Sequence, residues 1–70
     1  MKSRWDIYPG SGEPFAMWLF TAAMARAEKE AAERPDETVK VQDADTGLLL
    51  AIWRDDGTKQ VWRDRWPQLT

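Results

Sequence analysis

The chain has 70 residues with ten Lys or Arg, twelve Asp or Glu, no His and no Cys, which gives a net charge of −2. A chain of this length forms one domain, here residues 1–70, and buries only about 60% of the surface that its unfolded form exposes. It cannot form disulfides or a zinc site of the usual ligands, so packing or a partner must stabilise it. The slightly acidic balance disfavours a general nucleic-acid-binding protein, which is normally basic.

No segment approaches the roughly 20 consecutive apolar residues that a membrane-spanning helix needs. The first residues are polar and lack the apolar stretch of a secretion signal. We therefore expect a cytoplasmic protein with no membrane association.

The first half of the chain predicts one strand and one helix. Residues 4–8 alternate polar and apolar side chains, as in a short half-buried strand. Residues 9–12 contain one Pro and two Gly and predict a turn. From Pro14 to about Arg34 most residues favour a helix, and Pro35 ends it.

The second half predicts three strands, over residues 38–42, 48–54 and 58–65, separated by turns at Gly47 and at Asp56-Gly57. The resulting order is β-α-β-β-β. We expect an α+β fold with one helix packed on one face of a mainly antiparallel sheet.

The strand register follows if Asp56-Gly57 is a two-residue turn. Ile52 then pairs with Val61, and Val39 lies opposite Ile52. The helix-facing side would be aliphatic, with Val39, Val41, Leu48, Leu50, Ile52 and Val61. A shift of one residue would place polar and apolar side chains together on each face, so the predicted register is favoured.

The predicted helix has more apolar surface than one sheet can cover. Its sheet-facing stripe contains Phe20, Met24 and Ala27, whereas Phe15, Trp18 and Ala22 lie on the opposite side of its first half. Such uncovered apolar residues mark interfaces when they are contiguous. We predict a protein interface at Phe15, Trp18 and Ala22, and a homodimer explains it best.

Trp53 and Trp62 are predicted on the sheet face away from the helix. Two explanations remain open for them. They form a second interface, because Trp is enriched at binding hot spots, or the tail of residues 66–69 folds over them.

The segment from Glu28 to Asp45 is rich in acids. One interpretation is a solvated helix end and two loops. The other is an acidic surface for a basic groove of a partner, formed by Glu30, Glu33, Asp36 and Glu37.

Single-stranded nucleic-acid binding is an alternative, because Arg54, Arg63 and Arg65 interleave with Trp residues. However, Asp55, Asp56 and Asp64 cancel most of this positive charge, and in the predicted register Trp and Arg side chains point to opposite faces. Catalysis is not expected, because no nucleophile–base pair can be assembled without His or Cys. Asp43 to Gly47 is best explained as a turn, and we predict no metal and no cofactor.

The stretch Gly47-Leu48-Leu49-Leu50-Ala51-Ile52-Trp53-Arg54-Asp55-Asp56-Gly57, followed by Val61-Trp62, resembles the closing hairpin of some small phage-encoded anti-CRISPR proteins. The resemblance covers residues 38–62. The third strand is one residue longer here, and the helix lacks that family's basic binding residues, so no site residue is carried over. The resemblance implies an inhibitor that binds a type I CRISPR surveillance complex in the bacterial cytoplasm and prevents target-DNA binding.

These observations together predict a small non-enzymatic protein-binding inhibitor from a phage or mobile element. The alternatives are a small single-stranded nucleic-acid-binding protein and a structural subunit of a phage or bacterial assembly.

Overall fold

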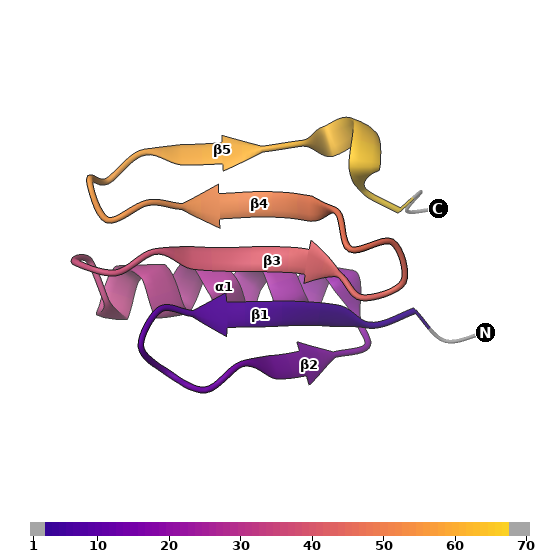
Figure 1. Ribbon diagram of the computed structural model, residues 1–70, viewed down its shortest axis with the longest axis horizontal. Coiled ribbons are helices and arrows are strands. Elements are labelled where there is room, and N and C mark those ends of the chain that lie inside the picture. The colour runs from indigo at the N-terminus through magenta and orange to yellow at the C-terminus, as the bar shows by residue number, and fades with distance from the viewer. Residues whose placement is uncertain (1–2, 68–70) are drawn as a thin grey trace.

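Across residues 3–67, five antiparallel strands form one sheet, and one α-helix covers one of its faces (Figure 1). This computed structural model describes residues 3–67. The elements are β1 (Trp5–Pro9), β2 (Phe15–Met17), α1 (Phe20–Glu33), β3 (Val39–Asp43), β4 (Leu49–Trp53), β5 (Lys59–Val61) and the 3₁₀ turn η1 (Arg63–Arg65). The predicted α+β class, with one helix on one face of an antiparallel sheet, is confirmed.

The strand order is β2-β1-β3-β4-β5. Both β2 and β3 pair with β1 in antiparallel fashion, so they run in the same direction on either side of it. A connection between two such strands needs a crossover, and α1 provides it. Figure 1 shows α1 behind β1 and β3, with the opposite face of the sheet toward the viewer.

Strand β2 was not predicted, and α1 begins later than expected. Residues 15–17 pair with β1, with Asp6 opposite Ala16, and the helix begins only at Phe20. Its first turn is closed by the Ala23 N–H, which donates to the Leu19 carbonyl. The predicted start at Pro14 is wrong because pairing with β1 overrides the helix propensity of these residues.

The predicted register of the last three strands is wrong by one residue. Val39 lies opposite Trp53, and Ala51 lies opposite Val61. The hairpin loop is one residue longer than expected: the Gly57 N–H donates to the Arg54 carbonyl, and Gly57 has a φ of 89°. A turn followed by a left-handed residue is the common three-residue hairpin loop.

A β-bulge in β4 accommodates this register. The pairing shifts between Val41 and Gln42, which leaves Leu50 as the extra residue on β4. Both Leu50 and its neighbour Ala51 are fully buried. The bulge therefore explains why this strand is apolar on successive positions.

The core lies between α1 and the sheet. The helix contributes Phe20, Ala23 and Ala27 of its predicted stripe. The sheet contributes a larger set of buried apolar side chains: Trp5, Ile7, Val39, Val41, Leu50, Ala51 and Trp53. Beyond β5, Trp66 closes one end of the core. Its ring lies edge-on to Phe20 at 5.2 Å, and its indole N–H donates to the Leu50 carbonyl.

The tail predicted to cover Trp53 and Trp62 is described only in part. Trp66 packs against the core beside Phe20, whereas Gln68 and Leu69 lie outside the described residues. Over the part of the chain that is described, no helix combines the length and apolar character needed to cross a membrane.

Candidate functional site

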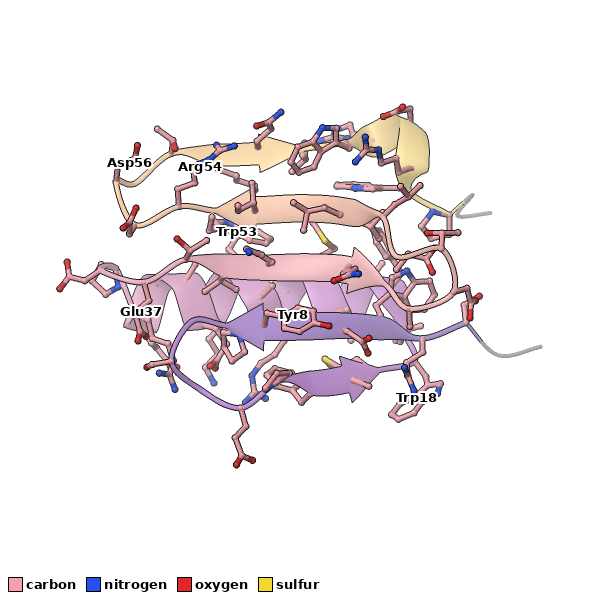
Figure 2. The ribbon with its side chains drawn as sticks, in the orientation of Figure 1. Tyr8, Trp18, Glu37, Trp53, Arg54 and Asp56 are labelled. Carbon is pink, nitrogen blue, oxygen red and sulfur yellow. The ribbon has the colours of Figure 1, made fainter. Side chains whose placement is uncertain are left out.

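The most exposed apolar side chains follow the edge strand β2. Trp18 is 60% exposed and Leu19 is 64% exposed. Within residues 3–67 no strand pairs with the outer side of β2. Figure 2 shows Trp18 projecting from the end of this edge, away from the sheet. An open strand edge beside exposed Trp and Leu side chains is a typical site for association with another chain.

The three predicted interface residues do not share one helix face. Phe15 lies in β2, half-buried against the core, with the Arg26 guanidinium 5.1 Å from the centre of its ring. Trp18 lies between β2 and α1, and Ala22 is half-buried on α1. Of the three, only Trp18 is strongly exposed. Leu19 was missed because the predicted helix placed it at the flank of the buried stripe.

Trp53 and Trp62 lie on different faces of the sheet. Trp53 shares its row with Val39 and is only 9% exposed, so its predicted place on the face away from the helix is wrong. Trp62 follows Val61, which packs against the core. Since side chains alternate along a strand, Trp62 lies on the face opposite the helix, as predicted.

The predicted acidic surface is smaller than expected. Glu30 is only 8% exposed, and its carboxylate accepts hydrogen bonds from Arg26 (3.3 Å) and Arg34 (3.4 Å). Its predicted place on the surface is therefore wrong. Glu33 and Asp36 are exposed.

Glu37 is half-buried and fixes the loop before β2. It accepts hydrogen bonds from the Ser11 backbone N–H and from the Arg34 guanidinium, both at 3.2 Å. These two partners, Ser11 first, lower the pKa of Glu37 below its ordinary value. Its carboxylate is therefore committed to contacts within the chain.

The sheet face opposite the helix is left open by the elements of residues 3–67, and we call it the open face. Tyr8, Lys40, Ile52 and Gln60 form one row across it, because they are paired with one another and alternate with the buried row of Val39 and Trp53. Figure 2 shows Tyr8 in front of β1, on the side away from α1.

Cations surround this row. Arg54 follows the buried Trp53 and donates to the Gln60 side chain at 2.6 Å, which places it on the open face. The Arg65 guanidinium lies 5.3 Å from the centre of the Trp62 ring and also donates to the Leu49 carbonyl. The predicted register places Trp and Arg on opposite faces, whereas the observed register brings Trp62, Arg54 and Arg65 to one face.

A groove of about 380 Å³ lies on the other side of the sheet, between the second half of α1 and the β4–β5 hairpin. Trp53 and Ala31 are among its lining residues, and the Lys59 ammonium lies 5.3 Å from the centre of the Trp53 ring. The same ammonium is 4.0 Å from Glu28 on the helix. These contacts tie the hairpin to α1 across the groove.

Asp43 and Asp45 form a turn, as predicted. The Asp45 N–H donates to the Asp43 carboxylate at 2.8 Å, and the Gly47 N–H donates to the Asp43 carbonyl. Among residues 3–67 no three acidic side chains are grouped in a way that could hold a metal ion.

No family model, curated protein or solved structure matches the chain. Its function is therefore argued from its surfaces.

Proposed function

We propose that this protein is a small non-enzymatic inhibitor that acts by binding other proteins. The observation that supports the proposal best is the pair of exposed side chains, Trp18 and Leu19, beside the unpaired edge of β2. Covering Trp18 and Leu19 with a partner would be favourable because it removes their apolar surface from water. A strand added to β2 would also pair the free backbone groups of this edge.

The first partner that this edge suits is a second copy of the chain. A twofold axis at Ala16 would pair β2 with the β2 of the other copy in antiparallel fashion, with Phe15 opposite Met17 in both halves. Trp18 and Leu19 would then extend the contact at both ends of the short strand. The predicted homodimer thus acquires a specific geometry.

A more specific form of the proposal is an anti-CRISPR protein of a phage, acting in the bacterial cytoplasm. It is supported by the resemblance of residues 38–62, which form β3, β4 and the hairpin to β5. In this form the exposed acids Glu33 and Asp36 would face a basic nucleic-acid channel of a type I surveillance complex.

The test of self-association is the mass in solution, measured by light scattering during size-exclusion chromatography. Wild-type protein is expected to be dimeric, and the double variant Trp18→Ser/Leu19→Ser is expected to dissociate at least tenfold more readily, because each side chain contributes roughly 2 kcal/mol when buried. The matched control is Leu48→Ser, which removes an exposed Leu (45% exposed) from the β3–β4 turn. A monomeric wild type would contradict the dimer, and heterogeneous large species would favour an assembly subunit.

The test of inhibition is capture of a type I surveillance complex from nuclease-treated lysate on the tagged protein. Stoichiometric recovery of its subunits, reduced by the double variant Glu33→Gln/Asp36→Asn, would support the anti-CRISPR form. If nothing is captured while the bait is folded, that form fails, whereas the dimer test still decides whether β2 is an interface.

A further inference from the structure

The open face differs in charge from the rest of this acidic protein. It holds Lys40, Arg54 and Arg65, and at its β1 end Arg4, which pairs with Asp6 at 3.2 Å. At the strand positions that point to this face the acidic side chain is Asp6, and the other nearby acids lie at the ends of the strands or in the turns. The rows of this face therefore carry more positive than negative charge, and Asp56 in the β4–β5 turn lies close enough to Arg54 to interact with it.

Two aromatic side chains share this face. Tyr8 lies in the central row on β1, and Trp62 lies just beyond β5. Three strand spacings separate these two strands by about 14 Å across the sheet, and Trp62 also lies two residues further along than Gln60, which shares the row of Tyr8. Neither ring is fully buried. Arg65 positions Trp62 by lying over its ring while its Nη1 donates to the Leu49 carbonyl.

A shallow hollow of about 260 Å³ lies beside Tyr8. Arg4, Asp6 and Ala16 are among its lining residues. It therefore combines an aromatic ring, a hydrogen-bond donor and an acceptor next to the sheet surface. A flat ligand with polar edges matches this combination, and a nucleobase is such a ligand.

We propose that the open face binds single-stranded nucleic acid, with bases stacked on Tyr8 and Trp62 and backbone phosphates near Lys40, Arg54 and Arg65. Aromatic rings interleaved with cations on an exposed surface are the arrangement by which proteins bind single strands without strong sequence preference. The hollow shares Ala16 with β2, but the site uses neither Trp18 nor Leu19 of that edge, and it goes beyond the proposed protein binding.

The salt dependence follows from the number of cations. With about three phosphates neutralised, the logarithm of the affinity falls with a slope of about −2 against the logarithm of salt concentration, so binding weakens roughly twentyfold between 50 and 200 mM. The probe is a fluorescein-labelled dT12 oligonucleotide, with fluorescence anisotropy as the readout at low salt.

Two variants test the site, and one controls for net charge. Lys40→Glu changes an exposed side chain of the central row and is expected to weaken dT12 binding at least tenfold. Lys29→Glu makes the same change of charge on the exposed side of α1 and is expected to leave binding within about twofold. Tyr8→Leu keeps an apolar side chain but removes the ring, and we expect a roughly tenfold loss.

Three results would overturn the proposal: no binding of dT12 at 20 mM salt, equal losses for Lys40→Glu and Lys29→Glu, or no loss for a folded Tyr8→Leu variant. Capture of a protein partner that depends on Lys40, without binding of dT12, would assign the face to that partner instead. The variant Trp18→Ser/Leu19→Ser is expected to bind dT12 normally, so failure of the dimer and failure of this site can be told apart.

Discussion

Replacing Trp53 tests the strand register directly, because the sequence-based register and the structure place this residue on opposite faces. In the structure Trp53 lies in the core row with Val39 and is 9% exposed. Truncation of a buried Trp to Ala costs about 3–5 kcal/mol. A 70-residue domain has a free energy of unfolding of only about 4–10 kcal/mol. Trp53→Ala should therefore remove about a third of the stability or more.

Trp62→Ala is the matched comparison. Trp62 is half-buried on the open face, so its truncation should cost about 1–2 kcal/mol. If Trp53→Ala does not fold, Trp53→Phe keeps an aromatic ring in the core and should cost about 1–2 kcal/mol, which leaves a measurable transition.

The assay is urea unfolding followed by far-ultraviolet circular dichroism, because removing a Trp changes the fluorescence signal itself. Equal slopes against urea concentration would show that the midpoints can be compared. A loss for Trp53→Ala no larger than the loss for Trp62→Ala would refute the reasoning, since both side chains would then lie on the open face, as a two-residue turn at Asp56-Gly57 requires.

Two further predictions concern the loop between β1 and β2. Gly10→Ala should lower the midpoint of thermal unfolding more than Gly57→Ala does: both positions have positive φ, but a Cβ at Gly10 would lie 2.7 Å from the Cβ of Glu37, whereas no described atom lies within 4 Å of one at Gly57. Equal losses would contradict the clash. Contacts with Ser11 and Arg34 lower the pKa of Glu37 in the folded state, so the unfolded state takes up its proton first as the pH falls. The stabilisation that ionised Glu37 gives the folded state is therefore present above about pH 4.5 and is lost as the pH falls through the lowered pKa. Between pH 7 and 3 the midpoint of thermal unfolding should therefore fall less in Glu37→Gln than in the wild type. An equal fall in both proteins would contradict the assignment.

The sequence was sufficient for features that depend on local pattern. The apolar stripe of Phe20, Ala23 and Ala27 follows from helical periodicity, and the structure buries it as expected. The positions of β3 and β4 and the start of β5 follow from alternation and from the glycines between them. The strand predicted to reach about Arg65 ends at Val61, where η1 replaces its second half. These features combine into the correct fold class because a single amphipathic helix and an antiparallel sheet have few ways to cover one another.

Strand β2 and the register could not be predicted, because each depends on a distant pairing. Residues 15–17 favour a helix locally, and only the edge of β1 makes them extended. The dipeptide Asp56-Gly57 suits both a two-residue and a three-residue loop. The choice between them shifts one strand of the hairpin by one residue relative to the other. In the structure β5 keeps its predicted faces and β4 is the strand that changes, so Trp53 lies in the core row and Arg54 on the open face.

This one-residue shift also changes what the surface can do. The net charge of −2 is distributed unevenly over the molecule. Exposed acids lie on and after α1, whereas cations and two aromatic rings lie on the open face. The edge of β2 belongs to neither side. Pairing of two β2 strands about an axis perpendicular to the sheet would leave both open faces on the same side of one continuous sheet. Self-association and binding on the open face are therefore sterically compatible.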